Sequence, residues 1–154
     1  MKKKVKIELE ATLENQGLAR AFAAAYASEA DPTVEEITEI KTAVSEAFSN
    51  AVIHGYPSSV NEEKNVSEAH QIVTMELIML CEDTLMIKIS DEGIGIENVT
   101  EAMEPLFTTY DGEECSGMGF TVMESFTDKL TVDSEKGKGT TVTMIKKLDT
   151  YYGL

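Results

Sequence analysis

The chain has 154 residues, of which 42% are hydrophobic and 27% are charged, values typical of one globular domain with a sizeable core. Its 13 basic and 28 acidic residues give a net charge of −15. This charge argues against nonspecific binding to nucleic acid or to an anionic membrane surface, because such binding depends on a basic patch. An anionic ligand would have to be met by backbone amides and a metal ion, and we expect any protein partner to be basic rather than acidic.

The termini and the cysteines exclude further classes. Cys81 and Cys115 lie far apart with no C-x-x-C spacing, so no redox or metal motif is indicated. The basic N-terminus leads into alternating charges rather than an apolar core, and no apolar run is long enough to span a bilayer. We therefore expect a cytoplasmic protein with neither a membrane nor a nucleic acid as its partner.

The first third of the chain predicts a strand and two helices. Apolar and charged residues alternate over residues 5–10, as in a half-buried strand. Residues 14–29 are alanine-rich, with large apolar side chains every four residues, which predicts an amphipathic helix. Asp31 and Pro32 resemble an N-cap and first helical residue, so a second helix is expected to begin there and to end just before Gly55.

The remaining elements are expected late in the chain and mostly in hairpins. In chain order they are an exposed polar loop at 57–71, a hairpin of strands 71–80 and 85–90, a short helix near 97–104, a helix at 119–126 and a closing hairpin of strands 129–135 and 140–148. This order predicts an α/β (α+β) two-layer sandwich, with a mixed, largely antiparallel sheet and helices on one face. We expect residues 1–154 to form a single domain.

Three polar residues share one face of the second predicted helix. Glu46, Asn50 and His54 are four residues apart, on a different side from the apolar stripe. On this pattern alone, a solvated helix face is the better explanation. Asn50, however, is a weak helix former, an amide oxygen suits Mg²⁺, and a glutamate one turn away could act as a base.

Two glycine motifs follow predicted secondary structure. The first is Asp91-Glu-Gly93-Ile-Gly95-Ile, directly after a strand, where glycine permits positive φ and close approach of a ligand. The second is Ser-Gly117-Met-Gly119-Phe at a helix start, where free backbone N–H groups can hold phosphate oxygens. Each motif alone is weak. The third glycine of a dinucleotide fingerprint, the P-loop motif and the protein-kinase signatures are all missing.

The order of the motifs is more informative than any one of them. The chain reads E-x-x-x-N-A-x-x-H-G, then D-E-G-I-G-I, then S-G-M-G-F, then G-K-G-T-T-V. This order resembles the GHKL ATPase superfamily of gyrase, the heat-shock chaperone, histidine kinases and mismatch-repair proteins. It is most similar to the sporulation anti-sigma-F factors, serine kinases of that superfamily, in the phrases DPTVEEITEIKTAVSEAFSNAVIHGY, PLFTT and SGMGF. The resemblance covers nearly the whole chain, apart from residues 57–71 and 110–115, and implies the Bergerat ATP-binding fold.

The resemblance implies a role for each matching residue. Glu46 corresponds to the acidic residue that activates the acceptor, Asn50 to the Mg²⁺ ligand and Asp91 to the acceptor for the adenine amino group. Thr108 would lie in a mobile lid, and Thr140 would support adenine recognition. The implied contacts to ATP are Asn50, Asp91, Gly93, Gly95, Ile96, Thr108, Gly117, Met118, Gly119, Phe120 and Thr140.

The implied function is that of an anti-sigma factor. Such a protein would bind and inhibit a sporulation sigma factor, and would use Mg-ATP to phosphorylate a serine of an anti-anti-sigma protein. The resemblance also implies a homodimer, with Arg20 as a candidate partner contact, although a solvated charge explains Arg20 equally well.

One departure from the family pattern keeps an alternative open. Cys115 stands where the family usually has a basic residue, the segment 110–115 contains no basic residue, and Arg20 is the only arginine. Phosphoryl transfer depends on cations that neutralise developing charge. The alternative is therefore a nucleotide-dependent module that sequesters the sigma factor with weak or no kinase activity. A histidine-kinase ATPase domain fits less well, because the chain lacks a dimerising hairpin with a phosphoacceptor histidine.

Overall fold

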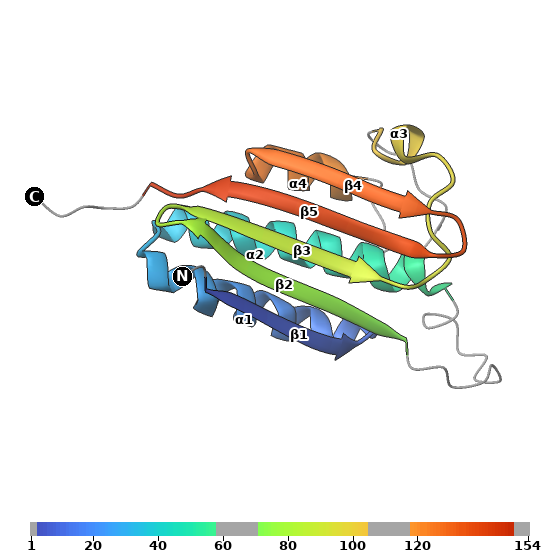
Figure 1. The fold of residues 1–154 in the computed structure, drawn as a ribbon, viewed down its shortest axis with the longest axis horizontal. Coiled ribbons are helices and arrows are strands. Elements are labelled where there is room, and N and C mark those ends of the chain that lie inside the picture. Colours follow the sequence, from blue (N-terminus) through green and yellow to red (C-terminus); the bar gives the residue numbers. More distant parts are fainter. Residues whose placement is uncertain (1–2, 58–70, 105–117, 150–154) are drawn as a thin grey trace, which may run out of the picture.

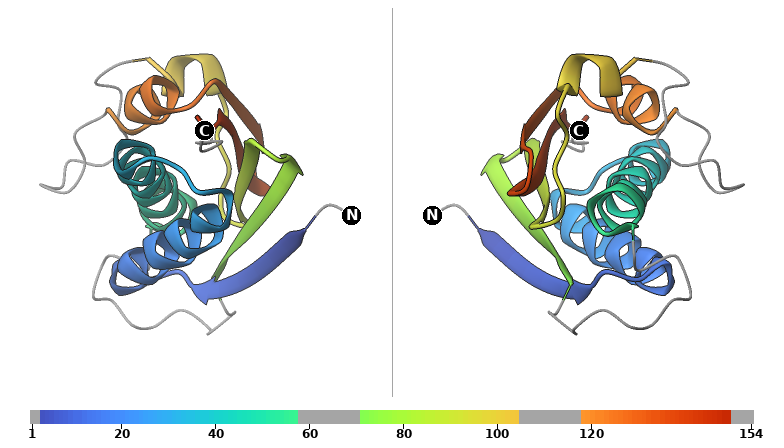
Figure 2. Two further views of the ribbon diagram at one scale, coloured as in Figure 1. Left: turned by 90° about the vertical axis from the view of Figure 1, so that its left-hand side faces the viewer. Right: turned by 90° about the vertical axis from the view of Figure 1, so that its right-hand side faces the viewer.

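The computed structural model describes residues 3–57, 71–104 and 118–149, which form a five-stranded sheet with helices on one face (Figures 1 and 2). The strands are β1 (Lys4–Glu10), β2 (Ile72–Cys81), β3 (Thr84–Asp91), β4 (Lys129–Glu135) and β5 (Gly139–Lys147). They lie in the order β1-β2-β3-β5-β4. The predicted two-layer α/β sandwich is confirmed. Every pairing between the described strands is antiparallel. We had expected a mixed sheet that is largely antiparallel, but no parallel pair occurs among these strands.

The helical layer contains the elements expected from periodicity. The helices are α1 (Gln16–Ala27), α2 (Val34–Asn50), α3 (Val99–Ala102) and α4 (Gly119–Phe126). Short 3₁₀ turns flank α1, so the helical stretch predicted for residues 14–29 is confirmed. A π-helical turn, Ala51–Gly55, extends α2, and the helical run therefore ends at Gly55 as predicted.

The start of α2 differs from the prediction. Thr33, not Asp31, is the N-cap: its Oγ1 accepts from the Glu36 amide at 3.1 Å, while Glu36 Oε2 accepts from the Thr33 amide at 2.8 Å. This capping box satisfies two orphan amides at once. Asp31 instead adopts a left-handed conformation with φ 53°, which suits the turn out of the preceding 3₁₀ segment.

The core lies between the sheet and the helices. Alternate residues of the central strands are buried, and they pack against the apolar sides of α1 and α2. Phe48 of α2 is completely buried in this core. In β3 these inward residues are Leu85, Ile87 and Ile89. Asp91 is the next residue of the same alternation. A carboxyl group therefore points toward the helical layer at the end of the strand.

Candidate functional site

The carboxyl group of Asp91 lies at one end of the site. Only 7% of the residue is exposed, and Oδ1 accepts a hydrogen bond from the Gly93 amide at 2.9 Å. Burial raises the pKa of Asp91 to about 6, although hydrogen bonds from the backbone amides of Gly93 and Thr140 oppose the shift. Gly55 ends the π-helical turn directly beside it: a Cβ there would lie 2.7 Å from Asp91 Oδ1. The lack of a side chain at Gly55 thus lets the helical run approach the carboxyl group.

The glycine turn after β3 is held in place by backbone contacts. The Ile94 amide donates to the Gly55 carbonyl at 3.0 Å, and a side chain at Gly93 would collide with that carbonyl. Gly95 has φ 72°, and its Cα faces the backbone of Glu135 with no room for a Cβ. Gly95 thus has the positive φ that was expected, and both glycines are also required by close packing against the backbone of other segments.

Thr140 belongs to a small hydroxyl cluster beside the same turn. It pairs with Asp91 in the β3–β5 register, and its Oγ1 lies 2.8 Å from Ser134 Oγ. Ser134 also accepts from the Ile96 amide at 2.7 Å and donates to the Gly139 carbonyl at 3.0 Å. Thr140 and Ile96, predicted separately, are thus joined through one serine that sequence reasoning missed.

Tyr56 is a second residue that sequence reasoning missed. Its hydroxyl donates to the Ile72 carbonyl at 2.9 Å and accepts from the Glu92 amide at 2.8 Å, and only 8% of the residue is exposed. Burial raises its pKa. The Tyr56 hydroxyl group therefore ties the backbone of Glu92, which lies between Asp91 and Gly93, to the start of β2. The only signal in the sequence was an aromatic residue directly after the helix-terminating Gly55.

Glu46, Asn50 and Gly119 form the other end of the site. A Cβ at Gly119 would lie 2.9 Å from Asn50 Nδ2, 3.2 Å from Asn50 Oδ1 and 3.3 Å from Glu46 Oε2. The start of α4 is therefore packed against both predicted side chains, and burial raises the pKa of Glu46. Met118 and Phe120, the neighbours of Gly119, are both half-buried. Burial also lowers the pKa of His54, which keeps its ring neutral at pH 7.

The two ends share one helical run. Asn50 closes α2 and Gly55 closes the π-helical turn, five residues later, which corresponds to a rise of about 7–8 Å at the spacing of an α-helix. Asp91 and Gly119 therefore meet opposite ends of a short segment, on a scale that suits a nucleoside with its phosphates at the α4 end.

Three of the residues named above, Thr108, Gly117 and Cys115, lie outside the described residues, as does nearly all of the predicted loop at 57–71. Arg20 lies on the exposed side of α1.

The donor set fits a magnesium ion that arrives with a nucleotide. No group of three or more histidine, cysteine or acidic side chains that could hold a metal occurs among residues 3–57, 71–104 and 118–149. Mg²⁺ commonly keeps several waters and binds through one or two protein oxygens together with substrate phosphates. The amide oxygen of Asn50, beside the amino end of α4, can supply one such ligand.

The sequence pattern of the family described as "Histidine kinase-like ATPase domain" matches residues 9–146. The chain belongs to this family. It is 50% identical over 150 residues to the anti-sigma F factor of Clostridium perfringens (strain SM101), which covers 97% of this chain and 100% of the relative. It is 49% identical over 148 residues to the anti-sigma F factor of Clostridium acetobutylicum, covering 96% of this chain and 95% of the relative. Within the ATPase family the chain therefore belongs to the anti-sigma F factors, and the expected resemblance is confirmed.

Two solved structures share this fold. The structure of the RsbU and RsbW domains of Rv1364c from Mycobacterium tuberculosis aligns with a TM-score of 0.62 and 19% identity, covering 95% of this chain and 32% of that one. The mycobacterial sensor histidine kinase MprB aligns with a TM-score of 0.56 and 15% identity, covering 94% and 98%. At these identities the likeness supports the fold alone. Among residues 3–57, 71–104 and 118–149, none of the helices combines the length and the apolar composition that a membrane span requires.

Proposed function

We propose that this protein is a cytoplasmic anti-sigma factor and Mg-ATP-dependent serine kinase. It would bind and inhibit a sporulation sigma factor, and would phosphorylate a serine of an anti-anti-sigma protein. One observation carries the enzymatic part of this proposal: the Glu46 carboxylate and the Asn50 amide both lie against Gly119, at the start of α4. A base and a metal ligand are thereby brought to a helix N-terminus that can hold phosphate.

The adenine base binds at the Asp91 end of the proposed site. The carboxylate accepts a hydrogen bond from the exocyclic amino group, and it is already oriented by the amides of Gly93 and Thr140. Because Gly55 carries no side chain, the space beside the Asp91 carboxyl group stays open to the purine. The cluster of Thr140 and Ser134 supplies further hydroxyl groups beside the ring.

The phosphates bind at the other end of the proposed site. The first turn of α4, which begins with Met118, Gly119 and Phe120, has backbone N–H groups without helical acceptors, and these can donate to phosphate oxygens. The amide oxygen of Asn50 would hold the magnesium ion, and the ion would supply positive charge beside the transferred phosphoryl group.

Glu46 takes the proton from the acceptor serine. Its pKa is raised by burial, which makes the carboxylate a stronger base than an exposed glutamate, and general-base catalysis contributes about 10²–10⁴-fold. The acceptor oxygen can then attack the γ-phosphorus as ADP leaves.

Helix α1 supports the proposal of protein partners. Leu18 and Phe22 are 46% and 41% exposed and share one side of the helix, whereas Arg20 is exposed on another side, about 160–200° away around the axis. Exposed large apolar side chains on one face of a helix are typical of a protein interface. We propose that the sigma factor or the anti-anti-sigma protein contacts this surface, and that the protein acts as a homodimer.

A second function, sequestration of the sigma factor without efficient kinase activity, is favoured by the lack of positive charge in residues 110–115, next to the predicted lid. Residues 110–115 contain no basic side chain, and Arg20 is the only arginine of the chain. If no other cation reaches the γ-phosphate, phosphoryl transfer is slow. The protein would then be a nucleotide-dependent module that sequesters the sigma factor.

Radiolabelled ATP and the cognate acceptor separate the two functions. The wild-type protein should label the acceptor, whereas Glu46→Gln should lower the rate by about 10²-fold or more and retain its affinity for ATP. Glu124→Gln is a matched control, because Glu124 is exposed on α4. Undiminished transfer by Glu46→Gln would refute the role of the base. Binding of ATP without labelling by the wild type would favour the sequestering module.

A further inference from the structure

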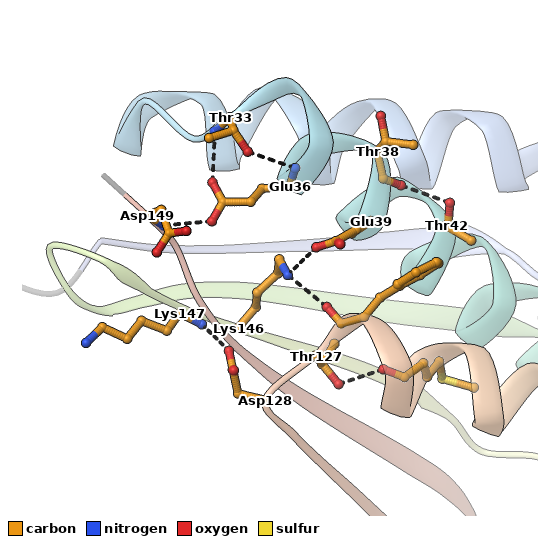
Figure 3. Close-up of polar contacts among 12 residues, drawn as sticks. Thr33, Glu36, Thr38, Glu39, Thr42, Thr127, Asp128, Lys146, Lys147 and Asp149 are labelled. Carbon is orange, nitrogen blue, oxygen red and sulfur yellow. Dashed lines mark hydrogen bonds and ion pairs between the residues drawn. The ribbon is translucent and has the colours of Figure 1, made fainter. Parts of the chain in front are cut away.

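Lys146 occupies a core position in β5. The inward residues of this strand and its extension are Val142, Met144, Lys146 and Leu148, and each is at least 91% buried. A charged side chain in this series is costly unless its ammonium group is fully paired. Lys146 Nζ donates to Glu39 Oε2 at 2.6 Å and to the Phe126 carbonyl at 2.9 Å (Figure 3).

These two contacts join three elements. Glu39 belongs to α2, and Phe126 is the last residue of α4, so Lys146 ties both helices to the sheet. The ammonium group of Lys146 lies at the carboxyl end of α4, which is the negative end of the helix dipole. Its hydrogen bonds are also stronger than those of a neutral donor, because the donor is charged. Nearby, Asp128 anchors the chain after α4 by accepting from the Lys147 amide at 2.6 Å (Figure 3).

The geometry of the two helices links this contact to the candidate site. Glu39 precedes Glu46 by seven residues on α2, and Gly119 precedes Phe126 by seven residues on α4. Both separations correspond to about 10.5 Å along a helix axis. The helices therefore run antiparallel and meet at two places: at Lys146, and where Gly119 contacts Glu46.

We propose that Lys146 is a positioning residue for the phosphate end of the site. By holding the carboxyl end of α4 against α2, it sets where the amino end of that helix lies relative to Glu46 and Asn50. Lys146 itself touches neither nucleotide nor metal. This inference rests on the proposed function, because it assumes that phosphates bind at the start of α4.

The adenine end should not depend on Lys146. Asp91 is oriented by Gly93 and Thr140, and Thr140 lies six residues from Lys146 on β5, or about 20 Å along the strand. Loss of the lysine should therefore change recognition of phosphate without changing recognition of the base. A residue that only stabilised the fold would affect both ends together.

Calorimetric titrations with adenosine and with Mg-ATP provide the test. In Lys146→Met, the affinity for Mg-ATP should fall about tenfold or more while the affinity for adenosine stays at the wild-type value. The rate of serine phosphorylation at saturating ATP should fall by up to about 10²-fold, as expected when reacting groups are misplaced by about 1 Å. Lys146→Arg should restore part of both losses. Lys147→Met is the matched control, because Lys147 is the exposed neighbour, and it should behave as the wild type.

A double variant separates positioning from stability. Glu39→Met/Lys146→Met removes both charges, so it avoids an unpaired carboxylate even if Lys146→Met alone folds poorly. If Lys146 positions α4, the ratio of the affinity for Mg-ATP to the affinity for adenosine should remain lower in this double variant than in the wild type. A wild-type ratio of the two affinities in the double variant would overturn the inference. Failure of the wild-type protein itself to bind adenine nucleotides would instead overturn the proposed function.

Discussion

The buried carboxyl group of Asp91 should make adenine binding dependent on pH. Its pKa of about 6 means that roughly one molecule in eleven carries the ionised form at pH 5, against about nine in ten at pH 7. Only the carboxylate offers both oxygens as acceptors to the amino group of adenine. The affinity for the base should therefore fall by about tenfold between pH 7 and pH 5.

Adenosine is the appropriate ligand for this measurement. It carries no phosphate, so neither the titration of a phosphate nor the binding of magnesium contributes to the pH profile. Isothermal titration calorimetry between pH 5 and pH 8 should show an affinity that rises to a plateau above pH 7. Asp91→Asn should bind adenosine more weakly at pH 7 and should show no inflection. A flat wild-type profile, or the same inflection in Asp91→Asn, would refute this account of the adenine end.

The same shift has a consequence for stability of the ligand-free protein. A pKa raised from 3.8 to about 6 means that Asp91 stabilises the fold when protonated. This contribution is fully present below pH 3.8 and is lost as the pH rises through 6. It amounts to about 3 kcal/mol, from roughly two units at 1.36 kcal/mol each. Urea unfolding of the wild type and of Asp91→Asn should show a difference in unfolding free energy that changes with pH over this range.

Three further substitutions test separate parts of the structure. Gly119→Ala places a Cβ 2.9 Å from Asn50 Nδ2. In calorimetry, the affinity of this variant for Mg-ATP should fall about tenfold or more, while its affinity for adenosine stays unchanged. Equal losses for both ligands would contradict the assignment of phosphate binding to the start of α4. Tyr56→Phe removes the part-buried hydrogen bonds of the Tyr56 hydroxyl to the Glu92 amide and the Ile72 carbonyl and should cost about 0.5–1.5 kcal/mol for each bond in urea unfolding. Thr33→Ala should cost about 1 kcal/mol as a lost N-cap without altering nucleotide affinity, and an unchanged unfolding midpoint would argue against the capping box.

Most of the fold could be predicted from local patterns in the sequence. Alternation of apolar residues marks β1 and both hairpins, and helical spacing marks α1, α2 and α4. The start of α2 was predicted wrongly because an aspartate followed by proline is a common helix start. The sequence T-x-x-E at Thr33 and Glu36 carried the competing signal, and a reciprocal capping box satisfies more backbone amides than a single side-chain cap.

The parts of the site that could not be predicted depend on contacts between distant segments. Ser134 is an ordinary strand residue in the sequence, and it becomes part of the site because it meets the Ile96 amide across 38 residues. Lys146 follows the inward alternation of β5, but its partner Glu39 lies 107 residues away. Such pairs are fixed by the register of the sheet and by the packing of helices on it, which no local pattern specifies.

The π-helical turn shows how one helical run could serve both ends of the proposed site. In a regular α-helix, Asn50 and Gly55 would be about 140° apart around the axis, since five residues advance by about 500°. The wider i→i+5 turn at Ala51–Gly55 advances less per residue. It therefore brings Gly55, which faces Asp91, closer to the side on which Asn50 faces α4. A ligand that spans both contacts then needs only a short path along the helix, so the local irregularity supports the proposal that the two predicted motifs belong to a single site.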